Sequence, residues 1–521
     1  MTSEQIQILI TMIVYLTGVV AIGVIYMKRA NRDSDSYFLG DRGLGPWVAA
    51  MSAEASDMSG WLLMGLPGVA YWCGLADAAW TAIGLALGTY LNWLIVSRRL
   101  RRYSVRVKSV TLPEFFSNRF HEKNSLILII SALFILIFFT VYAASCLVTC
   151  GKLFSTLFGT SYVLMMIIGA VFVLIYTFLG GFLAESVSDF VQAIVMIAVL
   201  VITLGVGVSA AGGFGAVIDN TGKIPGFLEF FGIASPVLSD GAQVVENGAP
   251  VFGEAASYGF LSVASALAWG LGYFGMPQVL LRFMAIKEEK KLKMSRRIAI
   301  IWCVISLAAS VIIGLIGRSL YPTDLSTQAQ SENVFILMSE NLLPPLIAGL
   351  SMAGILAATM SSSDSYLLIA SSAAAKDIYK RVLKKDASEK QIMTVSRITL
   401  VIITLIAIVV AIDEDSRIFS IVSFAWAGFG ATFGPLVLFS LFWKRTTAAG
   451  AVAGMIGGGV SVFVWKLYLN PLGGLFKIYE LLPAFIISSL LILVVSLLTK
   501  KPEGEVEEDF DAVAIGKGAE A

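Results

Sequence analysis

The segment 52–60 concentrates oxygen-bearing side chains inside a long apolar stretch, 45–70. It holds the acids Glu54 and Asp57, together with the hydroxyl groups of Ser52, Ser56 and Ser59. A carboxylate at the centre of a lipid bilayer costs roughly 2.5–3.5 kcal/mol on insertion scales, so it needs a partner. No lysine or arginine in the apolar stretches stands out as that partner, and hard oxygens suit a small hard cation such as sodium. The pattern favours a cation site at Asp57 over a protonated, hydrogen-bonded acid, and it leaves Glu54 open between a second ligand, a proton site and a buried acid.

A second group of oxygens occurs in the run 360–365. Helical periodicity places Ser361, Asp364 and Ser365 on one face, with Ser362 about 100° away. Serines in membrane helices commonly pack against neighbouring helices or bond to the preceding turn. The added Asp364 leaves a functional and a structural role equally open.

A third acid, Asp189, stands between serines in the apolar stretch 183–210. If Asp189 and Asp364 approach each other, a low dielectric does not let both stay ionised without a cation between them. The hypothesis is a second cation position formed by Asp189, Asp364 and Ser365. The slightly favoured alternative is that Asp189 neutralises basic loops and that Asp364 caps local backbone.

Aromatic residues accompany two segments that predict broken helices. Three glycines between Trp269 and Pro277 have the spacing of a dinucleotide fingerprint, but that fingerprint requires a preceding strand and a βαβ unit. In an apolar helix the glycines and Pro277 predict a break instead. Trp269 and Tyr273 are one turn apart and could line one wall of a cavity, with Trp61 and Tyr142 near the other break. The alternative is that they are ordinary core or lipid-belt aromatics.

The composition indicates what surrounds these residues. Of 521 residues, 57% are hydrophobic and 14% are charged, whereas about 25% of a soluble domain is charged. The excess apolar surface must face lipid, so the chain is an integral membrane protein. A net charge of +1 gives no sign of nucleic-acid binding, and four cysteines with one histidine argue against a zinc or haem enzyme. Without a nucleotide site, transport would be driven by a gradient or be passive.

The hydropathy predicts an all-α fold with about thirteen membrane spans. The spans are 6–27, 45–70, 76–97, 125–156, 161–180, 183–210, 257–285, 298–319, 340–375, 394–412, 418–443, 447–467 and 480–499. Basic residues concentrate in alternate loops, which by the positive-inside rule puts the N-terminus outside and the C-terminus in the cytoplasm.

The two broken spans are five crossings apart. Spans 2–6 and 7–11 would therefore form two five-helix halves of opposite orientation, which is typical of inverted-repeat transporters with a binding site at the breaks. The predicted parts are an extra helix and cytoplasmic loop (1–44), a first repeat (45–210), an outer loop with short interfacial helices (211–256), a second repeat (257–443), two further helices (444–499) and a disordered cytoplasmic tail (500–521).

The chain resembles the sodium/solute symporter family, and within it the bacterial sodium/proline symporters. The resemblance is carried by SDMSGWLLMGLPG at 56–68, AWGLGYFG at 268–275 and AWAGFG at 425–430, and it extends to about residue 499. It implies thirteen helices and a five-plus-five core of the leucine-transporter type.

The resemblance also implies site residues. Sodium would be held by the carbonyls of Ala55, Met58 and Ala358 and the hydroxyls of Ser361 and Ser362, with Asp57 and Ser59 supporting. Ser362 stands where a threonine is expected, so the oxygen is kept and a methyl is lost. Proline would contact Trp61, Tyr142, Trp269, Tyr273, Pro277, Asp57 and Met58. Some relatives bind a second sodium with an aspartate and serines at the places of Asp189, Asp364 and Ser365.

The function expected from this likeness is uptake of L-proline coupled to sodium entry across the cytoplasmic membrane, with no enzymatic activity. Sodium is the co-transported ion, and proline and lipid are the partners. The alternatives are the same fold carrying pantothenate, another amino acid or a monocarboxylate, a substrate-sensing receptor, and a passive sodium channel.

Overall fold

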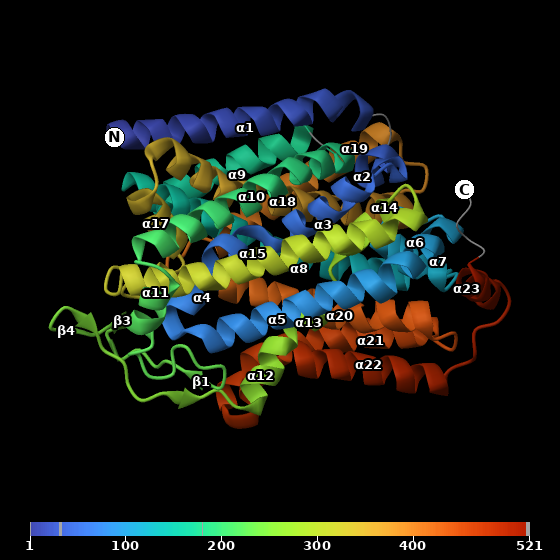
Figure 1. Cartoon of the computed structure of the whole chain (residues 1–521). Helices are drawn as coiled ribbons and strands as arrows, with labels where there is room; N and C mark the ends of the chain where they lie inside the picture. Colours follow the sequence, from blue (N-terminus) through green and yellow to red (C-terminus); the bar gives the residue numbers. More distant parts are fainter. Residues whose placement is uncertain (1, 31–33, 180, 517–521) are drawn as a thin grey trace.

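The computed structural model describes residues 2–30, 34–179 and 181–516 of the chain. Within these ranges the molecule is a bundle of long helices that run side by side, with the strands and the start of α1 at one end (Figure 1). The short helix α23 lies at the opposite end, which we call the tail end. Parts of three sequence-based predictions, at 31–33, 180 and 517–521, lie outside the described residues.

The elements have the following bounds. Helices α1 to α11 are Ser3–Ala30, Ser34–Leu39, Pro46–Gly60, Leu66–Cys73, Leu75–Leu91, Ser97–Arg106, Leu112–Arg119, Leu126–Phe158, Tyr162–Leu179, Phe182–Ala210 and Phe214–Thr221. Helices α12 to α23 are Phe260–Leu267, Trp269–Gly272, Pro277–Ala285, Leu292–Leu320, Gln328–Ser331, Val334–Leu342, Pro345–Ser372, Glu389–Val410, Ile418–Phe442, Ala448–Val464, Leu481–Leu498 and Glu505–Ile515. Strands β1 to β6 are Gly232–Ile233, Leu238–Ser239, Ala242–Gln243, Val245–Glu246, Ala249–Pro250 and Ala256–Ser257.

Eleven helical segments of the described chain are long and apolar enough to cross a membrane. Two further predicted spans correspond to α3 with α4, which is interrupted, and to α9, which is shorter. The all-helical membrane fold is thereby confirmed, while the count of thirteen and the internal repeat stay predictions. The predicted span 340–375 begins too early, because α17 ends at Leu342 and Pro345 opens a separate helix, α18.

The first predicted break lies between α3 and α4. Ser59 has φ 49° and ψ −169°, a conformation in which an L-residue cannot continue a right-handed helix. The backbone then passes through a π-helical turn, Trp61–Gly65, before α4 begins with Pro67 in its first turn. The carbonyl of Leu62 in this turn accepts a hydrogen bond from the Ser310 hydroxyl of α15 at 2.5 Å. A protein donor therefore satisfies a carbonyl at the break, as backbone at membrane depth requires.

The second predicted break separates α13 from α14. The helix ends after Gly272, and Met276 is extended, with φ −75° and ψ 109°, ahead of Pro277 at the start of α14. Gly270 lets this segment cross α5 at backbone contact, since a Cβ on Gly88 would lie 2.3 Å from the Gly270 carbonyl oxygen. The glycines that resemble a nucleotide motif therefore serve a break and a close crossing.

The outer loop 211–256 differs from the expectation of short interfacial helices alone. It contains one such helix, α11, and most of its remainder forms two-stranded antiparallel sheets, in which β1 pairs with β6, β2 with β3 and β4 with β5. Turn glycines with positive φ, Gly241 and Gly248, join the last two pairs into hairpins, which favours strands over helix.

The expectation of a disordered tail is wrong for residues 505–515, which form α23 against α6. Phe510 and Val513, three residues apart on one helix face, are buried. The Phe510 ring also lies 5.0 Å from the guanidinium of Arg99 and 5.3 Å from that of Arg119. Two apolar anchors and a basic surface thus hold a segment whose composition alone predicts disorder.

We expect the docking of α23 to depend on pH through its ion pairs. The Lys501 ammonium holds the pKa of Glu507 below its usual 4.5, and the Asp511 carboxylate raises the pKa of Lys444 above its usual 10.5. A lowered carboxylate pKa stabilises docking above about pH 4.5, and that contribution is lost as the pH falls through the docked value. A raised lysine pKa stabilises docking below about pH 10.5 and is lost as the pH rises through the docked value.

Docking should therefore be tightest between these limits. A spin label at exposed Glu508 should be immobile at pH 7 and become mobile below about pH 4. Phe510→Ala is the matched variant, in which the label should be mobile at every pH. Equal mobility in all these samples would contradict a docked tail.

Candidate functional site

The predicted sodium ligands of α3 and α18 lie together. The hydroxyl of Ser361 donates to the carbonyl oxygen of Ala55 at 2.9 Å and is 3.2 Å from that of Ala358. The hydroxyl of Ser362 is 3.4 Å from the same Ala55 carbonyl. All four residues are buried. Two hydroxyls and two carbonyls from helices far apart in sequence thus converge one turn before the break at Ser59.

Met58 is the predicted ligand that the structure does not bring into this group. Its carbonyl accepts the backbone N–H of Trp61, as does the carbonyl of Ser59. The hydroxyl of Ser59 in turn lies 3.3 Å from the N–H of Trp61. Met58 and Ser59 therefore shape the break, and a movement of the Trp61 amide would free their carbonyls.

Asp57 connects the break in α3–α4 to the start of α14. Its Oδ1 lies 3.5 Å from the side-chain amide nitrogen of Gln278, the second residue of α14. The hydroxyl of Tyr273 lies beside the same carboxylate. The backbone carbonyl of Asp57 accepts a hydrogen bond from the Tyr142 hydroxyl of α8 at 3.2 Å. One acid thus touches both broken segments and α8.

The predicted aromatic residues form one wall across the two breaks. The ring centroids of Trp61 and Trp269 are 5.5 Å apart. The ring of Tyr273 meets Trp426 edge-on at 5.0 Å, and the indole N–H of Trp426 donates to the carbonyl of Trp269 at 2.7 Å. The indole nitrogen of Trp61 is buried and has no protein partner, so this wall offers a hydrogen-bond donor.

Sequence reasoning missed further members of the aromatic wall. Phe419 of α20 lies 6.0 Å from Trp61 and 5.2 Å from Trp269, and Tyr479 stacks on Trp269 at 5.3 Å. Tyr366 of α18 lies 4.2 Å from Tyr142. Aromatics in apolar helices are common, so no local signal marks these as neighbours of the breaks.

Glu54 faces away from the Ser361 group. Its Oε1 accepts hydrogen bonds from the Thr89 hydroxyl and the Trp93 indole, both at 3.3 Å, and Oε2 has no protein partner. Thr89 belongs to α5 and Trp93 to the π-helical turn that follows it. The structure therefore supports the buried hydrogen-bonded acid among the three roles left open for Glu54.

The second predicted cation position holds an arginine that the sequence reading overlooked. Arg282 of α14 is buried, and its guanidinium donates to Ser365 at 2.9 Å and to the Asp189 carboxylate at 3.1 Å. It also contacts the carboxylate of Glu185, which in turn accepts the Ser365 hydroxyl. A cation among the apolar residues of 257–285 was the available signal for this pairing, because charges in such segments face protein partners.

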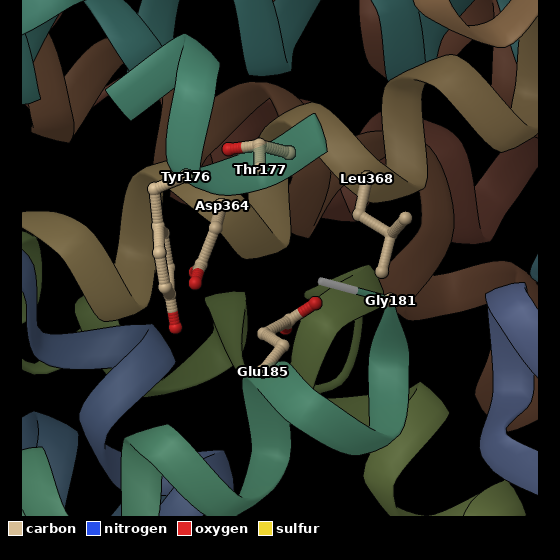
Figure 2. A pocket seen from close by; sticks show the side chains of 6 residues that line it. All are labelled: Tyr176, Thr177, Gly181, Glu185, Asp364 and Leu368. Carbon is tan, nitrogen blue, oxygen red and sulfur yellow. The ribbon is translucent and has the colours of Figure 1, made fainter. Parts of the chain in front are cut away.

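Asp364 lies at the edge of this cluster rather than on the arginine. Its Oδ1 accepts the backbone N–H of Ser365 at 2.8 Å, and its Oδ2 has no protein partner. Figure 2 shows the carboxylates of Asp364 and Glu185 facing one small cavity, beside the ring of Tyr176. The predicted trio therefore includes Asp189 and Ser365 on the guanidinium, with Asp364 capping backbone.

Comparison with known proteins agrees with this geometry. The sodium:solute symporter family matches residues 37–458. A sodium/proline symporter of Haemophilus influenzae is 43% identical over 96% of this chain and 97% of its own length. Sodium/proline symporters of Escherichia coli (41%, covering 96% and 95%) and Staphylococcus aureus (40%, covering 97% and 96%) are similar.

Among solved structures, a sodium-coupled sialic acid symporter in an outward-open state superposes with a TM-score of 0.74. It covers 95% of this chain and 99% of its own, at 18% identity. That likeness shows the fold, and the family match and the full-length relatives show the lineage. The protein is a transporter, not an enzyme, and it belongs to the sodium:solute symporter family.

Proposed function

We propose that the protein imports L-proline together with sodium. The single observation that carries this is the group of Ala55, Ala358, Ser361 and Ser362 oxygens at a helix break. Asp57 of the same break reaches the second broken helix, so an ion bound at the first break influences the residues at the second. The full-length relatives named sodium/proline symporters support the choice of solute.

Sodium fits the donor set. The two carbonyls and two hydroxyls are hard, neutral oxygens, and Asp57 in the next turn supplies the negative charge that a monovalent cation needs. The carbonyl of Met58 becomes a fifth ligand when the Trp61 amide releases it, with Ser59 keeping the turn open. Binding of the ion would thus order the break that borders the aromatic wall.

Proline fits the space between the two breaks. Its ring would lie against Trp269 and Tyr273, with Trp61 and Tyr142 closing the pocket. The amino-terminal end of α14, which begins at Pro277 and has no side-chain cap, presents freed backbone N–H groups suited to a carboxylate. Asp57 and Met58 would face the amino group. Sodium bound at Asp57 first would complete this pocket, which links the two binding events.

The driving force is sufficient for concentrative uptake. A membrane potential of about 100 mV supplies roughly 2.3 kcal/mol for each charge that enters, which corresponds to about a fifty-fold gradient. The sodium concentration gradient adds to this. We place the protein in the cytoplasmic membrane with its N-terminus outside and its C-terminus inside, as the basic loops at the tail end indicate.

Uptake of labelled proline into proteoliposomes tests the proposal. An inward sodium gradient should drive proline accumulation, which should stop when potassium replaces sodium. The same vesicles should accumulate little labelled pantothenate, acetate or alanine. Accumulation of one of these instead of proline would show the alternative solute, proline binding without uptake would indicate a receptor, and sodium flux without proline would indicate a channel.

We expect the two ligand hydroxyls to set sodium affinity. Ser361→Ala and Ser362→Ala should each raise the sodium concentration for half-maximal uptake by about tenfold, which corresponds to about 1.4 kcal/mol. Ser363→Ala is the matched control, because the Ser363 hydroxyl bonds only to its own helix, at Thr359 and Met360. Three equal sodium affinities would contradict the site.

A further inference from the structure

The guanidinium of Arg282 is the hub of a buried polar cluster that links four helices. Its Nε donates to Ser52 of α3 at 3.0 Å, and its Nη1 donates to the backbone carbonyl of Gln278 in its own helix at 3.1 Å. Its Nη2 reaches Glu185 and Asp189 of α10 and Ser365 of α18. The Ser52 hydroxyl also donates to Asp189 at 2.7 Å, which closes a ring of contacts.

The cluster carries more acid than base. Glu185, Asp189 and Asp364 are all buried, and each has one carboxylate oxygen without a protein partner. Arg282 is the cation that these acids contact among the described residues. Within the same residues no three histidine, cysteine or acidic side chains converge as a metal-ligand set. The guanidinium thus stands where acids of two helices would otherwise require a bound ion.

The location of the cluster connects it to both broken helices. Ser52 lies one turn before Ala55, and Ser365 lies one turn after Ser361, so both contacts of Arg282 extend helices that supply the sodium group. Arg282 itself lies one turn after Gln278, which contacts Asp57. The positive charge is therefore covalently part of the helix that faces the proposed substrate.

We propose that Arg282 is the resident cation of this cluster and takes the place of a second transported sodium. It is a positioning residue: it holds α14 against α3, α10 and α18 and leaves the oxygens at Ala55 and Ser361 as the single sodium site that drives transport. The proposal rests on the proposed sodium–proline symport and deepens it by fixing one sodium per proline.

A buried charge that loses its partner costs several kcal/mol, so the arginine cannot leave without replacement. Removing the guanidinium exposes carboxylates of α10 to one another in a low dielectric, and a solvent cation then becomes their preferred partner. Removing the guanidinium and one carboxylate together restores the balance. These two expectations separate a charge-holding arginine from one that only fills space.

The experiment measures sodium dependence of proline uptake and the ratio of labelled sodium to labelled proline in proteoliposomes. Wild type and Arg282→Lys should give a Hill coefficient near one and a ratio near one. Arg282→Gln should move both toward two and slow uptake at low sodium at least tenfold. Arg282→Gln combined with Asp189→Asn should return both values toward one and recover uptake.

Several results would overturn the proposal: a wild-type ratio of two, or an Arg282→Gln variant that stays at one. If Arg282→Gln transports too little to measure, sodium-dependent thermal unfolding in detergent replaces uptake. There the single variant should gain a sodium-dependent rise in melting temperature that the double variant lacks, and equal behaviour of the two would refute the idea. Absence of sodium-driven proline uptake in wild type would refute the proposed function instead, which is a different outcome.

Discussion

Asp57→Ala should raise the sodium concentration for half-maximal proline uptake by about a hundredfold while leaving the protein inserted in the membrane. The loss corresponds to about 2.8 kcal/mol, at 1.4 kcal/mol for each factor of ten. The physical reason is that Asp57 is the acid nearest the break between α3 and α4, one turn from neutral oxygens that otherwise carry no charge to balance sodium. Its contact with Gln278 would also be lost, which uncouples the break from α14.

Glu54→Gln is the matched control for this prediction. Glu54 lies three residues earlier in the same helix, but its carboxylate faces Thr89 and Trp93. The variant should keep wild-type sodium affinity. If Asp57→Ala behaved as wild type, or if both variants lost sodium dependence equally, the acid that balances sodium would have to be sought elsewhere.

The breaks and the sodium group could be predicted from sequence because their signals are local. Acids and serines inside an apolar stretch, and glycines followed by Pro277, announce their cost wherever they fold. The oxygens at Ala55 and Ser361 are far apart in sequence, and their pairing came from the family resemblance; the structure brings them to 2.9 Å. Trp61 and Trp269 likewise meet only because the two breaks lie side by side.

Other features have no local signal. Arg282 lies near the end of an apolar segment, where a basic residue usually marks the cytoplasmic boundary, and only the fold shows it buried among acids of α10. The tail is acidic and small-residue-rich, and Phe510 becomes an anchor only because Arg99 and Arg119 lie opposite. In both cases the deciding partner is more than ninety residues away.

Trp269→Ala and Tyr273→Ala should each weaken proline binding by about 1–3 kcal/mol if each ring packs on the substrate. That is roughly a fivefold to 150-fold loss of affinity, and sodium affinity should change much less. Truncating Trp269 removes a ring that stands 5.5 Å from Trp61 and 5.2 Å from Phe419, so the wall loses its centre. Equilibrium binding of labelled proline at saturating sodium measures the effect.

Two companions make the result specific. Tyr273→Phe keeps the ring and removes the hydroxyl beside Asp57, so it should retain proline affinity better than Tyr273→Ala and show its defect in sodium dependence. Trp47→Ala removes a tryptophan that is 52% exposed at the start of α3 and should leave both affinities unchanged. The ring contacts of Trp269 and Tyr273 also belong to the packing of α20, so the protein recovered in membranes must be equal before affinities are compared. An unchanged proline affinity in both alanine variants would move the pocket away from the two breaks, and with it the coupling role assigned to Asp57.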